Sequence, residues 1–488
     1  MKNLLTCGQL ASLDREAICD FRIPSIILIE NAAFGACSIL KKEIKDLEKK
    51  NILVVCGKGN NAGDGLALAR NIYYLGNKNI VCALTAEKGS ESFNTELEIC
   101  KNINIKLIPS KEIEKYFDKA DLIIDSLYGT GFKPPLRTEG ELLIKKINEL
   151  KNKKIISLDI PSGLGDLTAF SDLTINSDIT ITFGKDKICF YPSGNRLKVG
   201  KLFLVNPGFP LELLEKTKTS RFVYNFSDLK IKKVENTVYK NNRGHVAIFV
   251  GDKGKFGASI LAGKAAFEMG SGLVTLIGKV ESKDSFEFPQ FMQEEKINKG
   301  TNYSAILFGN GRIPNMENRE LLEQLLALDK PTVLDAGALR MLKDIDENLF
   351  KSRKSSLILT PHLGEFSSMQ KETTFNSAMA YLENCVKMSK VYNAIIVLKS
   401  YITWVISKEE IFIYDNPNSA LAVAGSGDVL SGCITSLLGQ GLDEVKACLN
   451  SVAIHNQTSF IINKEKKYFD AMELANSLGK SFKEIIEW

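Results

Sequence analysis

The sequence lacks long apolar runs and paired cysteine motifs, and each absence removes a class of protein. Its apolar stretch "SIILI", residues 25–29, is far too short to cross a bilayer, and the N-terminus turns charged too soon for a signal peptide. The ten cysteines include no C-x-x-C pair and no spacing typical of a metal site. Cys56, Cys82 and Cys433 lie within apolar runs, as small buried hydrophobic residues do. We therefore expect a cytoplasmic protein with reduced thiols and no membrane partner.

The charge balance removes a further class. The net charge is only +5 over 488 residues, and no dense basic stripe is interleaved with aromatic residues. Nucleic acid is therefore not the expected partner. With 44% hydrophobic and 25% charged residues, the composition is that of a soluble globular protein. At roughly 150 residues per domain, the length predicts two to four domains.

The first half of the chain alternates strand and helix signals. Six short apolar runs are expected as strands: residues 51–56, 79–84, 104–108, 120–125, 154–160 and 179–183. Most are continuous rather than alternating, which is typical of strands buried on both faces of a parallel sheet. Helical stretches lie between several of them, such as residues 65–76 with Gly76 as the C-terminal stop. The pattern predicts a Rossmann-like, doubly wound α/β domain.

A polar, basic stretch without clear period, residues 221–242, separates this half from a second α/β series. The second series has seven strand-like runs at residues 245–251, 272–278, 304–311, 331–337, 355–362, 394–400 and 401–407. We therefore predict domains at 1–220 and 243–488, joined by a junction at 221–242.

The loop "GKGNNAGDG", Gly57 to Gly65, follows the first predicted strand of the doubly wound domain. It is compatible with a ligand-free turn or with the G-x-G-x-x-A fingerprint of a dehydrogenase. A dehydrogenase should carry an acidic residue at the end of its second strand, and only Glu87 lies nearby, rather late. The dehydrogenase interpretation therefore falls short.

Three oxygen-bearing side chains lie where strands of this domain end. Asn61 follows the first strand, Asp125 ends the strand of "DLIIDSLYGTGF", and Ser162 follows the strand of "SLDIPSGL". Carboxyl ends of parallel strands converge on one crevice, so these oxygens could meet at one point. Oxygen ligands without histidine or thiolate suit a hard cation. A lone Asp at a strand end is more often a helix cap, but three such ends favour a site.

"GKGNNAGDG", "DSLYGTGF" and "LDIPSGL", in this order, closely resemble the NAD(P)H-hydrate epimerases, and "LLTCGQLASLD" with "IENAA" is similar to their N-terminal helices. The resemblance implies that Asn61, Asp125 and Ser162 hold a potassium ion and that Asp159 is the proton-transfer group. The implied substrate-binding residues are Asn60, Asn61, Ala62, Gly63, Asp64, Gly129, Thr130, Gly131, Phe132, Lys133, Pro134, Pro135 and Asp159. Two positions depart from the family pattern: Ala62, where glycine is usual, and Pro134, which removes a backbone donor from the substrate loop.

The strongest motif of the second half is "NSALAVAGSGDVLSGCITSLLGQG", Asn418 to Gly441. Apolar residues repeat every four positions from Val429, which predicts an amphipathic helix closed by Gly439 or Gly441. Backbone N–H groups of Gly425 to Gly427 before this helix would form an anion hole. Asp428 in the first turn could take a proton from a hydroxyl, or it could simply cap the helix.

G-S-G-D before such a helix resembles the ribokinase-like superfamily. Within it, "GKFGASILAGKAAFEMGSGLVTL", "LFGNG", "LTPHLGEF", "VLKS" and G-S-G-D together resemble the ADP-dependent NAD(P)H-hydrate dehydratases. The resemblance implies Asp428 as the base, with Ala258, Gly311, His362 and Asp428 contacting the hydrated nucleotide. The implied nucleotide-binding residues are Lys399, Ser400, Tyr401, Ile402, Thr403, Asn418, Ser419, Ala420, Leu421, Ala422, Val423, Ala424, Gly425, Ser426 and Gly427. Mg²⁺ and ADP are the implied cofactor and co-substrate.

Three positions of the second half depart from that family: Gly337 replaces a second carboxylate, Tyr239-Lys240-Asn241 replaces His-Lys-Gly, and Ser400 replaces glycine. Together the two resemblances imply an enzyme that epimerises R and S NAD(P)H hydrates and dehydrates the S form. We expect this enzyme to be a homo-oligomer. Its partners would be small molecules: hydrated NADH, hydrated NADPH and ADP. A small-molecule kinase with an unrelated N-terminal domain and a non-enzymatic binding module remain the alternatives.

Overall fold

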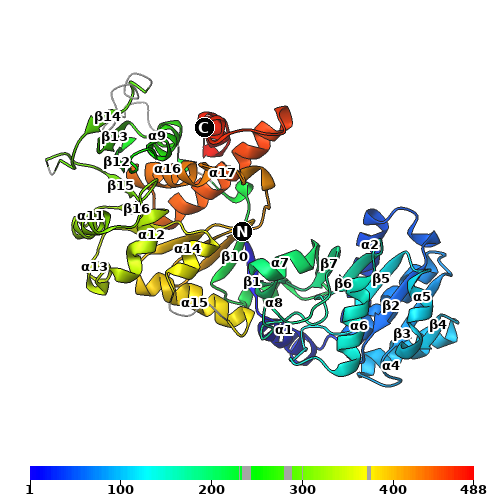
Figure 1. The fold of residues 1–488 in the computed structure, drawn as a ribbon. Helices are drawn as coiled ribbons and strands as arrows, with labels where there is room; N and C mark the ends of the chain where they lie inside the picture. The colour runs from blue at the N-terminus through cyan, green and yellow to red at the C-terminus, as the bar shows by residue number, and fades with distance from the viewer. Residues whose placement is uncertain (230, 233–242, 280–287, 299, 371–374, 488) are drawn as a thin grey trace. The chain divides into compact units, whose positions relative to one another are not determined.

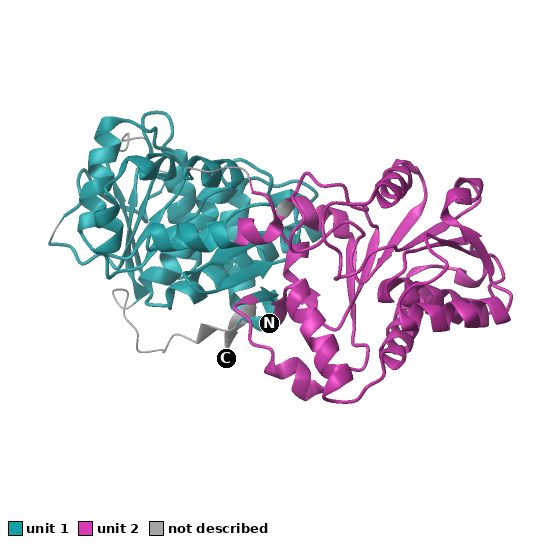
Figure 2. Cartoon of the chain, turned by 90° about the horizontal axis from the view of Figure 1, so that it is seen from below, with its two compact units in different colours: residues 1, 222–374, 383–488 teal, residues 2–221, 375–382 magenta. Residues whose placement is uncertain are grey.

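The computed structural model describes residues 1–229, 231–232, 243–279, 288–298, 300–370 and 375–487. These form two compact units, coloured separately in Figure 2. The N-terminal unit comprises residues 2–221 and 375–382, and the C-terminal unit comprises residues 1, 222–374 and 383–488. The unit boundary at residue 221 falls at the start of the predicted junction, of which residues 230 and 233–242 lie outside the described residues.

The N-terminal unit is built on a seven-stranded parallel sheet with the order β4-β3-β2-β5-β6-β7-β9. The strands are β2 Ile52–Cys56, β3 Ile80–Leu84, β4 Lys106–Pro109, β5 Leu122–Ser126, β6 Lys154–Leu158, β7 Ile179–Phe183 and β9 Lys201–Val205. The order reverses between β2 and β5, which is where doubly wound sheets open a crevice at their carboxyl ends. The predicted Rossmann-like domain is confirmed, and β9 is a strand that the sequence pattern missed.

Helices cover both faces of this sheet, as Figure 1 shows. The helices of this unit are α1 Cys7–Cys19, α2 Ser25–Glu43, α3 Asn60–Tyr74, α4 Glu91–Asn102, α5 Glu114–Phe117, α6 Thr138–Glu149, α7 Ser193–Val199 and α8 Leu211–Lys216, of which α1 and α8 pack together in a separate cluster. Along β2, Val54 packs with α2, α3 and α4, whereas Leu53 and Val55 pack with α6. Successive side chains point to opposite faces, so both faces need apolar residues and the run is continuous.

The C-terminal unit contains a mixed sheet in which β14-β13-β12-β15-β16-β17-β18 are parallel and β19 and β20 are added antiparallel. The strands are β12 His245–Phe249, β13 Leu273–Ile277, β14 Met292–Glu294, β15 Ala305–Phe308, β16 Thr332–Leu334, β17 Leu357–Leu359, β18 Ile395–Leu398, β19 Thr403–Ile406 and β20 Ile411–Tyr414. All seven predicted strands are present. The order reverses between β12 and β15, which places a second crevice at those strand ends.

Four helices pack into one core on this sheet: α9 Gly257–Glu268, α16 Ser426–Gly439, α17 Glu444–Glu465 and α18 Ala471–Ile485. The remaining helices are α11 Met316–Ala327, α12 Gly337–Met341, α13 Glu347–Lys351, α14 Leu363–Ser368 and α15 Ala378–Val391. The predicted amphipathic helix is α16, and Val429, Cys433 and Leu437 on it are fully buried. Gly432 lets α9 approach closely, because a Cβ there would lie 2.3 Å from the carbonyl oxygen of Ala262.

Two short strands lie inside the stretch predicted as a junction: β10, Arg221–Tyr224, and β11, Ile231–Lys232. β10 is the neighbour of β20 in the sheet. Phe222 stacks on Phe412 with ring centroids 5.2 Å apart, and Tyr224 packs on Tyr414 at 5.1 Å. The strand β10 is only four residues long, and polar and basic residues follow it. The sequence therefore did not indicate a strand here. Within the described residues, none of the helices combines the length and apolar character that crossing a bilayer demands.

Candidate active sites

A cavity of about 750 Å³ opens at the carboxyl ends of β2, β5 and β6 in the N-terminal unit. Gly57 allows the loops after β2 and β5 to meet, since a Cβ there would lie 2.0 Å from the carbonyl oxygen of Leu127. Ten predicted residues line the cavity: Asn60, Asn61, Asp64, Gly129, Thr130, Gly131, Phe132, Lys133, Pro135 and Asp159. Ala62 and Gly63 are instead buried in α3, and Pro134 is not among the lining residues. Ala62 is helical, so replacing the usual glycine demands no left-handed backbone there.

Two of the three predicted cation ligands, Asn61 and Ser162, contact the carbonyl oxygen of Tyr128, and the third, Asp125, contacts Ser162. Asn61 Nδ2 donates to this oxygen at 3.0 Å, and Ser162 Oγ lies 3.4 Å from it. Asp125 binds Ser162 twice, accepting from its Oγ at 2.5 Å and from its backbone N–H at 2.8 Å. Strand-end convergence therefore brings together the residues that sequence reasoning selected.

The oxygens at this point fit a hard cation. Asn61 Oδ1 is buried and has no hydrogen-bond partner among the described residues. Asp125 is fully buried, and burial raises the pKa of its carboxyl group even though Ser162 and Ser157 donate to it. A bound cation would satisfy the amide oxygen and compensate the buried carboxylate.

Asp159 lies just past β6 and is bound by a lysine that sequence reasoning missed. Lys187 Nζ donates to Asp159 Oδ1 at 2.7 Å and also contacts Thr182 Oγ1. Lys187 is fully buried; burial favours its neutral form, but the charge and hydrogen bond of Asp159 outweigh this and raise its pKa. Asp159 has a left-handed backbone, φ 63°, which is uncommon for a residue other than glycine.

Two further carboxylates face Asp159 across the cavity. Burial and the charge of Asp159 raise the pKa of Asp64 well above its usual range. Asp14 projects from α1, and limited hydration together with Asp159 raises its pKa to about 6. The Asp14 side chain is open to the cavity, but the surrounding protein still restricts water around it. Two carboxyl groups with raised pKa thus line the cavity with Asp159, and Asp14 is the second residue that the sequence did not reveal.

In the C-terminal unit, α16 begins with the predicted glycine-rich turn. Gly425 is left-handed, φ 91°, and a Cβ there would lie 2.5 Å from Leu261. The first hydrogen bond of the helix ladder runs from Val429 N to Gly425 O at 3.1 Å. The N–H groups of Gly427 and Asp428 precede it, as the free donors of a helix N-terminus do.

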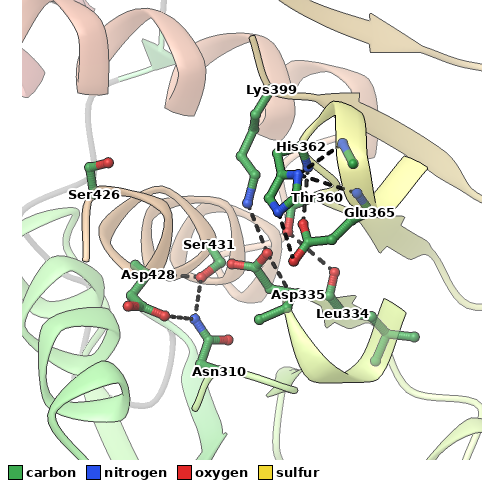
Figure 3. Close-up of polar contacts among 12 residues, drawn as sticks. Asn310, Leu334, Asp335, Thr360, His362, Glu365, Lys399, Ser426, Asp428 and Ser431 are labelled. Carbon is green, nitrogen blue, oxygen red and sulfur yellow. Dashed lines mark hydrogen bonds and ion pairs between the residues drawn. The ribbon is translucent and has the colours of Figure 1, made fainter. Parts of the chain in front are cut away.

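Asp428 is held by a buried amide. Asn310 Nδ2 donates to Asp428 Oδ1 at 2.6 Å and to Ser431 Oγ at 2.9 Å (Figure 3). Burial raises the pKa of Asp428 to about 6; the Asn310 hydrogen bond opposes this shift and the charge of Asp335 adds to it. Asn310 is fully buried and its Oδ1 has no partner among the described residues. Two carboxylates and an amide oxygen are the ligand types that Mg²⁺ takes.

Lys399 connects this turn to Asp335. Its Nζ donates to Asp335 Oδ1 at 2.9 Å, and a Cβ on Gly427 would lie only 3.4 Å from that nitrogen. A cation is therefore placed beside the N-terminus of α16, where an anion would bind (Figure 3). Lys399 was a predicted nucleotide-binding residue, whereas the roles of Asp335 and Asn310 as neighbours of the predicted base were not foreseen.

His362 serves as the N-cap of α14. Its Nδ1 accepts from the backbone N–H groups of Gly364 at 3.0 Å and Glu365 at 3.2 Å, so its Nε2 carries the proton. The His362 side chain is 54% exposed. Nearby, the backbone N–H of Lys399 donates to Pro361 O at 2.8 Å, and this bond connects the segments that follow β17 and β18. His362 therefore has a structural role, and its exposed ring edge is open to a ligand.

The other predicted positions surround the same strand ends. Gly311 is left-handed, φ 68°, and accepts from Asp252 N at 3.1 Å across the switch point between β12 and β15. Ala258 lies in the first turn of α9. Residues 399–403 run from the end of β18 to the first residue of β19, and residues 418–427 lead from the loop after β20 into the first turn of α16. Asn418 Oδ1 accepts from Ala420 N at 3.1 Å within the latter segment.

Gly337, a departure from the dehydratase pattern, has a packing reason. A Cβ at Gly337 would lie 2.0 Å from the carbonyl oxygen of Arg312, so no carboxylate fits without moving the backbone. A second departure from the dehydratase pattern, Tyr239-Lys240-Asn241, lies outside the described residues.

Because each unit carries its own buried acidic groups at the carboxyl ends of parallel strands, the chain is of the class of two-domain enzymes with separate catalytic centres. The NAD(P)H-hydrate dehydratase family matches residues 246–480, and the family described as YjeF-related protein N-terminus matches residues 25–189. The bifunctional NAD(P)H-hydrate repair enzyme of Dictyoglomus turgidum is 29% identical over 95% of this chain and 94% of its own. The NAD(P)H-hydrate epimerase of Rhodopirellula baltica is 32% identical over 43% of this chain and 86% of its own.

Among solved structures, the ADP/ATP-dependent NAD(P)H-hydrate dehydratase of Bacillus subtilis, co-crystallised with ATP and Mg²⁺, is 26% identical. The match covers 52% of this chain and 95% of the Bacillus subtilis chain, with a TM-score of 0.47. The chain belongs to the bifunctional NAD(P)H-hydrate repair enzymes, which join an epimerase to a dehydratase. The resemblance stated from the sequence motifs is thereby confirmed.

Proposed function

We propose that the N-terminal unit interconverts R and S hydrates of NADH and NADPH at Asp159, and that the C-terminal unit dehydrates the S form with ADP at Asp428. The observation that carries this proposal is the placement of these two carboxylates. Each lies at the carboxyl ends of parallel strands, in a separate unit, with a buried polar partner that fixes its orientation. Hydrated cofactors cannot transfer hydride, so the pair of activities repairs them.

Epimerisation needs a group that removes and returns a proton. Asp159 faces the cavity and is the proposed proton-transfer residue, while Lys187 holds its Oδ1. The other proposed substrate contacts are Asn60, Asp64 and the loop 129–135. Asn61, Asp125 and Ser162 would hold K⁺, which supplies positive charge beside the phosphates of the bound nucleotide. The neutral amide and hydroxyl ligands suit a monovalent ion.

Dehydration needs a better leaving group than hydroxide. Asp428 would accept the proton of the ring hydroxyl as that oxygen attacks the terminal phosphorus of ADP, forming a phosphate ester and releasing AMP. Loss of inorganic phosphate then restores the ring double bond. The N–H groups of Gly427 and Asp428 and the ammonium of Lys399 would stabilise the charge on the transferring phosphoryl group. Asp335 and the amide oxygen of Asn310, unpartnered within the described part of the chain, would hold Mg²⁺, which would neutralise phosphate charge.

The test is repair of a mixture of R and S hydrates, followed by the absorbance of the dihydronicotinamide ring. With ADP and Mg²⁺ the full chain should convert both epimers completely and release one AMP per cofactor. A stable phosphorylated product without restored absorbance would identify a small-molecule kinase instead. Binding of the hydrates without any turnover would identify a binding module. We also propose a cytoplasmic, homo-oligomeric enzyme.

A further inference from the structure

Two cysteines and an aspartate meet behind the Lys187 side of the N-terminal site. Cys7 begins α1 directly after β1, Lys2–Leu5, and Cys189 follows β8, Asp186–Lys187. These two short strands are parallel, with Leu5 opposite Lys187, so the residues two positions further along come together. Asp166 enters from the loop that follows Ser162. Three segments far apart in sequence therefore supply this cluster.

The separations match a metal site. The Sγ atoms of Cys7 and Cys189 are 3.8 Å apart, and a carboxylate oxygen of Asp166 lies with them so that all three atoms are within 4.8 Å of one another. In a tetrahedral zinc site with Zn–S bonds of about 2.3 Å, two sulfurs are separated by about 3.8 Å. Two thiols in van der Waals contact would show a similar spacing. The position of the Asp166 carboxylate is therefore the feature that indicates a metal site rather than simple packing.

The carboxylate of Asp166 is satisfied on one oxygen only. Gly8 N donates to its Oδ2 at 3.3 Å, and the thiol and backbone N–H of Cys7 also interact with the carboxylate. Its Oδ1 is buried and has no hydrogen-bond partner among the described residues. Both cysteines are also buried, with 5% of Cys7 and none of Cys189 exposed. A buried acceptor beside two thiols is costly unless a proton or a cation satisfies it.

A second thiol pair in the same unit provides the contrast. Cys56 on β2 and Cys82 on β3 also interact through their sulfurs and are fully buried. In the part of the chain that the structure describes, the cluster of Cys7, Asp166 and Cys189 is the one group of three His, Cys, Asp or Glu side chains with metal-ligand spacing. Two neighbouring thiols alone therefore do not indicate a metal site, whereas two thiols together with a carboxylate do.

We propose that Cys7, Asp166 and Cys189 bind a Zn²⁺ ion through two sulfurs and one carboxylate oxygen. On binding, each thiol releases its proton to solvent and the sulfur becomes a thiolate ligand. The buried ammonium of Lys187, close enough to Cys189 to influence its charge, would offset the negative charge of the site. The ion would join α1, which carries Asp14, to the strand that carries Lys187, and so fix the wall of the epimerase cavity. Soft sulfur ligands separate this site from the oxygen ligands proposed for K⁺.

The test is a Zn²⁺ titration of the full, reduced, metal-free chain against a chromophoric chelator, with Co²⁺ as a spectroscopic substitute. We expect one Zn²⁺ per chain, a thiolate-to-cobalt absorption band with Co²⁺, and a Zn²⁺-dependent rise in melting temperature. Cys7→Ser and Cys189→Ser should each weaken binding by more than the ~10–100-fold that outer-shell changes cost. Asp166→Asn, which retains the shape of the side chain, should weaken binding in the same direction.

Cys82→Ser is the matched control, because it alters the other buried thiol pair and should leave Zn²⁺ binding unchanged. The proposal is overturned if the parent chain binds no Zn²⁺, or if Cys82→Ser lowers the affinity as much as Cys189→Ser does. If a serine variant fails to fold, Asp166→Asn and the melting temperature of the parent chain still decide. None of these measurements depends on epimerase or dehydratase activity.

Discussion

Lys187 Nζ donates to Asp159 Oδ1 at 2.7 Å, and the lysine side chain is fully buried whereas the aspartate side chain is 13% exposed. The aspartate is thus the member of the pair that meets the cavity, and the lysine is its positioning residue. The buried ammonium fixes one oxygen of the carboxylate. The other oxygen lies 3.4 Å from Thr130 N, at the mouth of the substrate loop.

The pair allows catalysis and stability to be separated. Asp159→Asn should lower epimerisation by about 10²–10⁴-fold, the usual contribution of a general acid or base. It should also cost about 3–5 kcal/mol of folding free energy, because it leaves the buried charge of Lys187 without its partner. Adding Lys187→Met should restore most of the stability and none of the activity. Urea unfolding and epimerisation rates check this, and recovery of epimerisation in the double variant would contradict it.

Potassium should support epimerisation but not dehydration. We expect the epimerisation rate to fall when K⁺ is replaced by Li⁺ or a bulky organic cation, because neither matches the ligands around the Tyr128 carbonyl. Asn61→Ala should raise the K⁺ concentration for half-maximal rate by about tenfold, since a ligand worth about 1.4 kcal/mol is a factor of ten. Asn71→Ala is the control, because Asn71 bonds to a carbonyl of its own helix α3. If the parent epimerises equally fast with and without K⁺, and Asn61→Ala does the same, the cation site is ruled out.

Asp428→Asn should cut dehydration of the S epimer by about 10²–10⁴-fold. Its melting temperature should stay the same or rise, because Asn can accept the Asn310 hydrogen bond without a buried charge and is a similar helix cap. Nucleotide binding and epimerisation should remain near those of the parent. Asp443→Asn, at the N-cap of α17, is the matched control and should retain full dehydration. A dehydration rate close to the parent in Asp428→Asn would reduce Asp428 to a cap.

The dehydration rate should depend on pH through Asp428. As a base this carboxylate must be ionised, so the rate should fall as the pH drops through about 6, the value to which burial raises its pKa. The hydrogen bond from Asn310 lowers that pKa, so Asn310→Leu should move the acid limb of the profile to higher pH. Rates measured from pH 5 to 9 at saturating ADP check the shift. An unchanged or downward-shifted limb in Asn310→Leu would contradict the assignment of the base.

A C-terminal fragment should need β10. Residues 221–488 should fold and dehydrate the S epimer while leaving R behind, because Phe222 and Tyr224 supply aromatic pairs to Phe412 and Tyr414 on β20. Residues 234–488 lack those pairs, each worth about 0.5–1.5 kcal/mol beyond burial, and should melt at a lower temperature. Thermal unfolding of the two fragments compares them directly. Spontaneous epimerisation sets the background for the activity, and equal melting temperatures would assign β10 no role.

Patterns of neighbouring residues were sufficient for the doubly wound sheet and for part of each site. The continuous run of β2 predicted burial on both faces, and Val54 and Val55 do pack on opposite sides of the sheet. Strand-end logic brought Asn61, Asp125 and Ser162 to one place, because parallel strands present their carboxyl ends at one edge of a sheet. The N-terminal position of Asp428 on α16 followed from local periodicity in the same way.

The residues that sequence reasoning missed depend on tertiary contacts. Lys187 reaches Asp159 from a two-residue strand, β8, whose partner β1 is more than 180 positions away in sequence. Its one local signal is a lysine directly before the apolar run Ile188 to Phe190. Asp14 lies on α1 among residues typical of a solvent-exposed face. No local pattern marks it as a site residue, because only the fold brings α1 to the cavity. Asn310 lay within a motif that had been noticed, but its bond to Asp428 depends on the packing of β15 beside α16.

The left-handed backbone at Asp159 has a consequence for how such chains diverge. Glycine adopts this conformation freely, whereas a side chain there carries a steric penalty. Glycine alone would still destabilise the domain, because it would leave the buried ammonium of Lys187 without its carboxylate. A descendant that no longer repairs hydrates would therefore have to lose Asp159 and Lys187 together, so these two residues should change as a pair.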